Sequence, residues 1–303
     1  MSKSNNENNI LTVPTAILVS GIIIAGAVFL NSGPKEKINP PIAGGNPSLE
    51  VEETANEEAV IPKEGVVLPV VWGDLGVKLA SAGAIDAEKF RSLYESRGEW
   101  GDEYKKLLLE ENNGKLKITP ENASYILNLL WALGLAHKSP VLEKGEMMNP
   151  AYGGAGNFAS TGGWTLAEGN AMDHYSRHKF FNLTLEQEAL VDKVSRSIYR
   201  PCCNNSTHFP DCNHGMAMLG LLELMASQGV GEEEMYKVAL AVNSYWFPGT
   251  YLTIAGYLKN QGVEWRNANP REILGAKYSS ASGYKSVQEG NIPKPQGGGG
   301  CSV

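Results

Sequence analysis

The chain has 303 residues, of which 42% are hydrophobic, and its formal net charge is −7. This apolar content is enough to build a folded core, which excludes a wholly disordered chain. Basic residues do not cluster along the sequence, and binding to nucleic-acid phosphates needs clustered cations, so we expect no nucleic-acid partner.

The N-terminal part contains an uncharged, mostly apolar segment at residues 10–30. A helix needs about 20 such residues to cross a membrane, so we predict a transmembrane anchor preceded by a short segment at residues 1–9. A cleaved signal peptide is the alternative, because Ala25-Gly26-Ala27 resembles a cleavage site, although the apolar stretch is long for one. Large domains translocate largely regardless of charge, so we place the following domain on the extracytoplasmic side.

Composition divides the rest of the chain into three parts. Residues 31–65 are rich in proline and glutamate and poor in apolar residues, which predicts an extended, disordered linker. Residues 288–303 contain two prolines and a run of glycines before Cys301, which predicts a flexible tail that carries a terminal thiol. Between the linker and the tail, residues 66–287 form one predicted domain.

Helix signals dominate this domain. Pro120 is typical of a first helical turn and predicts a helix over residues 122–135. Thr184 and Gln187 predict a capping box ahead of a helix over residues 185–199. Further helices are predicted at residues 86–97, 213–228, 232–246, 250–260 and 269–274.

The predicted fold class is mainly α. Residues 213–228 are apolar on nearly every side, which predicts a buried central helix. The one segment that looks extended is 66–72, and Pro69 interrupts it.

Residues 148–170 carry six glycines and no helical period, which predicts a long glycine-rich loop. Its aromatic residues Tyr152, Phe158 and Trp164 have two interpretations, because they either form the wall of a binding site or pin a structural loop. The glycine pattern does not match a dinucleotide or P-loop fingerprint, so we expect no nucleotide cofactor.

Four of the five histidines and three of the four cysteines fall between residues 174 and 214. Thiolates and imidazoles are the ligands of Zn and, for thiolates, Cu(I), so the cluster predicts a site for a Cu or Zn ion. The predicted metal ligands are Cys202, Cys203, His208, Cys212 and His214. His174 and His178 are further candidates, because residues four apart share one face if their segment is helical.

Two other interpretations stay open. Cys212 precedes the predicted helix 213–228, whose dipole would stabilise a thiolate for disulfide exchange with Cys203 or Cys202. Cys301 on its tail would then be a further redox thiol, and the partner would be a thiol protein. In the third interpretation the chain is a non-enzymatic envelope protein with a structural disulfide, which is common in extracytoplasmic domains.

The motif PCC-x8-C-x-HGMAMLG over residues 201–220, together with the GGGGC tail, resembles an uncharacterised group of single-span, membrane-anchored bacterial proteins. The resemblance implies a location at the bacterial cell membrane, held by the chain's own anchor. It implies no catalytic residue, because the group has no assigned activity.

Overall fold

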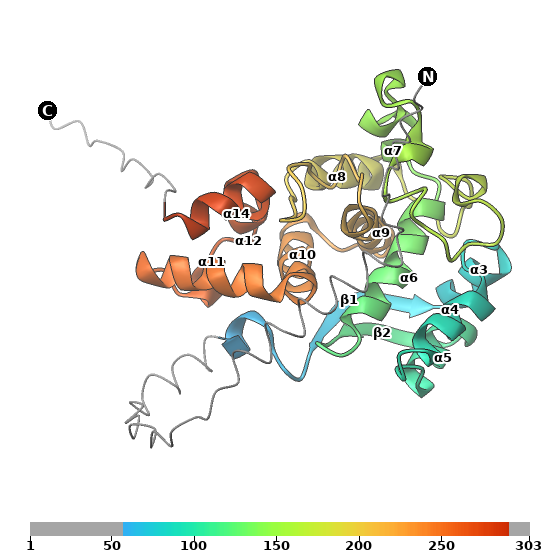
Figure 1. Cartoon of the computed structure of the whole chain (residues 1–303), viewed down its shortest axis with the longest axis horizontal. Coiled ribbons are helices and arrows are strands. Elements are labelled where there is room, and N and C mark those ends of the chain that lie inside the picture. The colour runs from blue at the N-terminus through green and yellow to red at the C-terminus, as the bar shows by residue number, and fades with distance from the viewer. Residues whose placement is uncertain (1–56, 291–303) are drawn as a thin grey trace, which may run out of the picture. The chain divides into compact units, whose positions relative to one another are not determined.

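The computed structural model describes residues 57–290, which form a mainly helical fold, as the sequence predicts (Figure 1). Two strands, β1 (Val66–Gly73) and β2 (Asn113–Ile118), make a small sheet. The α-helices are α3 (Leu75–Ser81), α4 (Ala87–Glu95), α5 (Asp102–Leu109), α6 (Ala123–Ala136), α7 (Pro140–Lys144), α8 (Leu185–Ser195), α9 (Asn213–Ser227), α10 (Glu232–Trp246), α11 (Pro248–Asn260), α12 (Pro270–Leu274), α13 (Ala276–Ser279) and α14 (Ala281–Gln288).

Several predicted features lie outside the described residues. These are the segment 1–9, the anchor at residues 10–30, most of the linker, and the tail with Cys301. Within the part that the structure describes, no helix combines the length and the apolar character needed to cross a bilayer. The anchor therefore stays a prediction from the sequence.

The end of the predicted linker is already part of the fold. Val60 is 3% exposed, and the Tyr245 hydroxyl donates a hydrogen bond to the Pro62 carbonyl oxygen at 2.7 Å. Residues 57–65 are thus ordered, which corrects the expectation of a disordered linker for this stretch. One buried valine and a hydrogen bond to α10 are enough to hold it, although its composition is polar.

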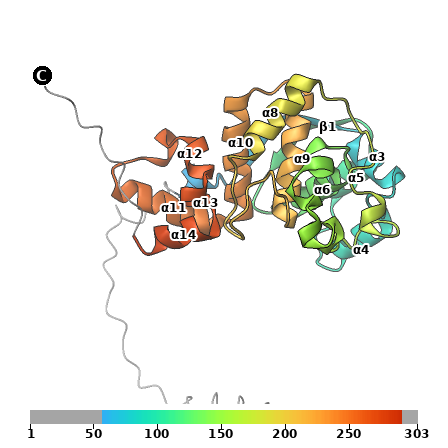
Figure 2. The ribbon, with the colours of Figure 1, turned by 90° about the horizontal axis from the view of Figure 1, so that it is seen from above.

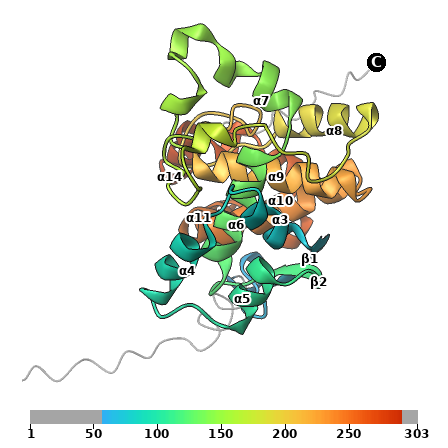
Figure 3. The same ribbon diagram turned by 90° about the vertical axis from the view of Figure 1, so that its right-hand side faces the viewer.

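α9 is the central helix, and the prediction that it is buried is confirmed, because all residues from Gly215 to Ala226 are buried. It packs against α6, α8 and α10, which surround it in Figures 1 and 3. The crossing with α6 is made possible by two glycines, Gly134 and Gly220. A Cβ on Gly134 would lie 2.0 Å from the Met216 carbonyl oxygen, so a larger residue would force the helices apart.

The capping box predicted for α8 is confirmed. The Thr184 hydroxyl accepts a hydrogen bond from Gln187 N–H at 3.3 Å, and Gln187 Oε1 accepts one from Thr184 N–H at 2.9 Å. Gln187 Nε2 also donates to the Ala226 carbonyl oxygen at 2.7 Å, which ties the start of α8 to the end of α9. The helix ends at Ser195, earlier than expected.

The structure corrects one prediction near the sheet and refines another. β2 was not expected, and it pairs antiparallel with β1, with Val66 opposite Ile118. α6 spans Ala123–Ala136, within one residue of the predicted 122–135 at each end. The sequence signal at Pro120 differs in detail, because Thr119 and Asn122 form a turn in front of the helix, in which Thr119 N–H donates to Asn122 Oδ1 at 2.8 Å.

The glycine-rich segment forms short 3-10 turns that aromatic residues hold in place. Trp164 is buried, and its indole N–H donates to the Ala84 carbonyl oxygen at 2.9 Å. Tyr152 and Phe158 pack against each other and against Phe209. These contacts favour the structural interpretation of the loop.

The C-terminal helices form a group beside α10 (Figure 2). α11 and α12 contact α10, and α14 contacts α11 and α13. The start of α14 reaches the turn that carries two of the cysteines, so this group helps to position the candidate site.

Candidate functional site

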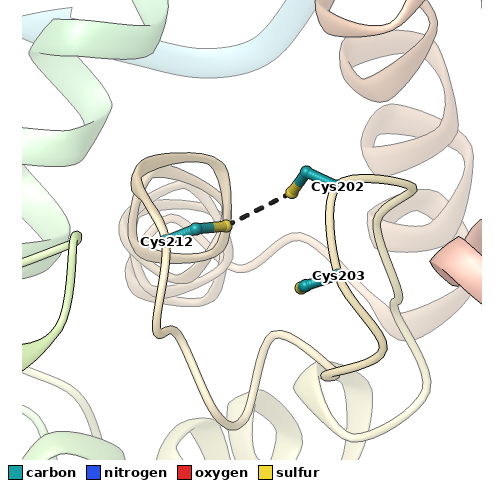
Figure 4. A group of neighbouring side chains, drawn as sticks. All are labelled: Cys202, Cys203 and Cys212. Carbon is teal, nitrogen blue, oxygen red and sulfur yellow. Dashed lines mark hydrogen bonds between the residues drawn. The ribbon is translucent and has the colours of Figure 1, made fainter.

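Three cysteine thiols lie together at the N-terminal end of α9 (Figure 4). Cys202 and Cys203 are on a turn, and Cys212 is the N-cap residue of the helix. The three Sγ atoms lie within 4.8 Å of one another, and those of Cys202 and Cys212 are 3.4 Å apart. All three are free thiols, and Cys202 is exposed. The three sulfur atoms are close enough together to hold a metal ion.

The segment between the cysteines folds back on itself. Tyr199 pairs with Ser206 in an isolated antiparallel bridge. The Cys203 carbonyl oxygen accepts a hydrogen bond from Ala281 N–H, at the start of α14, at 2.8 Å. These backbone contacts bring the turn with the first two cysteines onto the N-terminus of α9.

Arg200 places a buried positive charge beside the cluster, with 1% of the residue exposed. Its Nε donates to Cys212 Sγ at 3.0 Å, and a terminal guanidinium nitrogen pairs with the Asp211 carboxylate. The terminal nitrogens also donate to the carbonyl oxygens of Asn205 at 3.0 Å and Phe209 at 2.9 Å. The charge is therefore well hydrogen-bonded, as a buried charge has to be.

Gly215, in the first turn of α9, makes space for this guanidinium. A Cβ at this position would lie 2.5 Å from Arg200 Cζ. The Gly215 N–H also donates to Cys212 Sγ at 3.5 Å. Glycine thus admits the arginine, and its N–H is one of the free donors that a helix N-terminus offers to an anion.

The three thiols differ in acidity. Hydrogen bonds from Cys202 and Cys203, with further contributions from a hydrogen bond of His214 and from the positive charge of Arg200, hold the pKa of Cys212 well below its ordinary value. The pKa of Cys202 is raised, because its proton is held in hydrogen bonds to the neighbouring sulfurs. Cys212 is therefore the thiolate of the cluster, and Cys202 stays a thiol.

The two histidines predicted as ligands near the cysteines take separate positions. His214 lies in the first turn of α9, where its side chain contributes a hydrogen bond to Cys212 and its ring packs at a tilt against Phe247, with ring centroids 4.3 Å apart. His208 is buried on the other side of the loop, where its Nε2 lies 2.9 Å from Asp192 Oδ1. Among residues 57–290, no imidazole joins the three thiols in a group whose ligand atoms all lie within 4.8 Å of one another.

His174 and His178 form a pair of their own. The segment is a 3-10 turn followed by irregular chain, which corrects the assumption of a helix. The two rings still meet, with His174 Nδ1 3.1 Å from His178 Nε2, and His174 Nε2 lies 2.8 Å from the Glu168 carbonyl oxygen. Both ring nitrogens of His174 thus have partners within the protein.

Comparison of the chain with family models, with curated proteins and with solved structures gave no match. The chemistry of the site is therefore the guide to the function of this protein.

The sequence interpretation missed the charged residues of the site. Arg200 directly precedes Pro201-Cys202-Cys203, and Asp211 directly precedes Cys212. One charge of each sign next to the cysteines was a signal for a buried ion pair at the cluster. Gly215 gave no such signal, because its role depends on where the arginine side chain lies.

Proposed function

We propose that the three cysteines bind a thiophilic transition-metal ion, with Cu(I) preferred over Zn(II). The observation that carries this proposal is the third sulfur, because Cys203 lies within 4.8 Å of both Cys202 and Cys212. Disulfide chemistry needs only two thiols, whereas a soft ion gains from each additional thiolate. Structural zinc sites have four ligands, and among residues 57–290 no fourth Cys, His, Asp or Glu has a ligand atom within 4.8 Å of all three sulfurs.

The residues around the cysteines support binding of a cation. Cys212 binds an ion as the thiolate it already is, whereas Cys202 and Cys203 lose their protons as they bind, so uptake releases protons. The Arg200 charge offsets part of the negative charge that three thiolates bring together. Cys202 is exposed, so an ion reaches the cluster without unfolding of the domain.

Thiol–disulfide exchange is the second candidate, favoured by the 3.4 Å between the sulfurs of Cys202 and Cys212. The Cys212 thiolate would attack a partner disulfide and release one partner thiolate. Cys202 would then lose its proton and attack Cys212 Sγ, which forms a Cys202–Cys212 bond and leaves the partner reduced by two electrons. Against this order, the low-pKa sulfur is the half-buried one and the exposed thiol has the raised pKa.

Cys203 separates the two candidates, because it is a ligand in one and dispensable in the other. The reduced full-length protein is titrated with Cu(I) in competition with a chromophoric chelator under anaerobic conditions. We expect Cys203→Ser to weaken Cu(I) binding by more than about tenfold and His208→Gln to leave it unchanged. Unchanged Cu(I) affinity in Cys203→Ser, with retained reduction of a model disulfide, would reject the metal proposal in favour of exchange.

We further propose that the domain lies on the extracytoplasmic side of a bacterial membrane, tethered by residues 10–30. The support is the sequence alone, through the length and apolar character of that segment. Extraction of the full-length protein from membranes tests the tether, since carbonate washing releases a peripheral protein and leaves an anchored one in the pellet.

A further inference from the structure

A cavity of about 220 Å³ lies between α7, α8 and α9, and none of the three cysteines lines it. Its wall includes Ser139, Val141, Val191, Asp192, His208 and Glu223. At about 30 Å³ for each water molecule, the space would take about seven waters or a small organic molecule.

Three buried polar atoms on this wall have no hydrogen-bond partner among the described residues. They are Ser139 Oγ, His208 Nδ1 and Glu223 Oε2. Glu223 is 1% exposed in the middle of the apolar helix α9, and His208 is 5% exposed. A buried polar atom without a partner costs about 1–3 kcal/mol, and three of them on one cavity wall indicate that something else supplies the missing bonds.

The wall offers acceptors more than donors. An ionised carboxylate only accepts hydrogen bonds, so His208 Nε2, 2.9 Å from Asp192 Oδ1, carries the ring proton. That leaves Nδ1 with a lone pair, which makes it an acceptor. The Ser139 hydroxyl lies beside the Glu223 carboxyl and can both donate and accept a hydrogen bond. When Glu223 is ionised, all three atoms can accept hydrogen bonds, so a ligand that donates hydrogen bonds fits this form of the wall.

Two classes of ligand fit poorly. A metal ion needs gathered ligand atoms, and no three His, Asp or Glu atoms of this wall lie within 4.8 Å of one another. An anion would meet three acidic side chains, while Arg196 is already engaged by the Asp192 carboxylate through two hydrogen bonds at 2.9 Å. Lys144 lines the cavity but is exposed, so its charged group lies at the solvent side and is available to water.

We propose that this cavity binds a small primary ammonium compound, whose charged group meets Glu223 and whose hydrocarbon part packs against Val141 and Val191. An ammonium group carries three N–H donors, and the wall has three unpartnered acceptor atoms. The hydrogen bond between an ammonium and a buried carboxylate is charge-assisted and is among the stronger ones in proteins. This proposal does not depend on the function of the cysteine cluster.

Binding of such a cation is linked to protonation of Glu223. Burial raises the pKa of this carboxyl to about 8, so it holds a proton at pH 7 in the empty protein. An ammonium favours the ionised carboxylate, so binding at pH 7 releases close to one proton. The other charged side chains that line the cavity are Lys144, Glu188, Asp192, Arg196 and His208.

Calorimetry on the full-length protein tests the proposal, with butylammonium chloride as the probe and butan-1-ol as its neutral counterpart. We expect saturable binding of the amine in the millimolar range and none of the alcohol. Titrations at pH 7 in two buffers of different ionisation enthalpy should show the proton release. Glu223→Gln should weaken binding about 10- to 100-fold, because it removes a charged hydrogen bond.

Two further variants separate a direct role from a loss of structure. Ser139→Ala removes one acceptor and no charge, so it should weaken binding less than Glu223→Gln does. Glu186→Gln removes an exposed carboxylate from the first turn of α8, outside the cavity lining, and should leave binding unchanged. Absence of saturable binding, which would mean that the cavity holds water only, overturns the proposal. So does equal binding of the alcohol, or an unchanged affinity in Glu223→Gln.

Discussion

The carboxyl of Glu223 makes a quantitative prediction about stability. It lies in the middle of α9, is 1% exposed, and burial raises its pKa to about 8 from an ordinary value of 4.5. The folded protein therefore binds a proton here that the unfolded chain has lost above pH 4.5. The contribution of this group to stability is fully present below pH 4.5 and is lost as the pH rises towards 8.

The size of the effect follows from the shift. One pKa unit corresponds to about 1.4 kcal/mol, so the folded protein loses about 1.4 kcal/mol per pH unit between pH 4.5 and 8, or about 5 kcal/mol in total. Glu223→Gln has a similar shape and no titrating proton. The difference in free energy of unfolding between the variant and the wild type should therefore grow with that slope and become constant above pH 8.

Urea unfolding of the full-length protein, followed by circular dichroism at half-unit pH steps, measures this difference. Contributions from other titrating groups are common to both proteins and cancel in the comparison. Glu186→Gln is the matched control, because the pKa of that exposed carboxyl is lowered and it does not titrate between pH 5 and 8. Parallel curves for the wild type and Glu223→Gln over this range would show that the carboxyl is not held protonated by burial.

Two other predictions concern stability. Gly215→Ala should destabilise the protein by about 1–3 kcal/mol in denaturant unfolding, because the new Cβ would lie 2.5 Å from Arg200 Cζ. Gly256→Ala is the control: it lies within α11 with nothing near its Cβ, so it should stabilise the protein by about 0.5–1 kcal/mol. Burial lowers the pKa of His137 to about 4, so the free energy of unfolding of the wild type should fall by about 3 kcal/mol as the pH falls from 6.5 to 4. His137→Gln cannot titrate and should lack this part of the acid dependence. Equal effects of the two glycine substitutions on stability would contradict the first prediction. Identical acid profiles of the wild type and His137→Gln would contradict the second.

The helices were predictable where local signals set their ends. The capping box of Thr184 and Gln187 fixed the start of α8, and three glutamates opened α10 at Glu232, where it was expected. β2 did leave a short signal, because residues 115–118 alternate between exposed lysines and the buried Leu116 and Ile118. Four alternating residues are too few to predict a strand and its register, and the pairing with β1 completes it.

The sequence predicted the position of the cysteines in the candidate site better than that of the histidines. Cys202, Cys203 and Cys212 are close in sequence, and the helix start at Asn213 placed one of them at a cap. His208 lies among them in sequence, yet its partner Asp192 comes from α8, so its environment depends on tertiary packing. Glu223 did leave a signal, since it is the only charged residue in the apolar helix α9 and a lone acid there has to be buried or bound.

The hydrogen bonds of Arg200 show which substitutions are informative about the cysteines. Its guanidinium contacts Cys212 Sγ, but it also pairs with Asp211 and donates to two carbonyl oxygens. If the cysteines bind an ion or form a disulfide, the contact with Cys212 changes and the others persist, so the buried charge keeps its partners. Replacing Arg200 would instead leave the Asp211 carboxylate without its ion pair and disturb the turn in every case. Cysteine variants therefore report on the chemistry of the cluster, whereas Arg200 variants report on the frame that holds it.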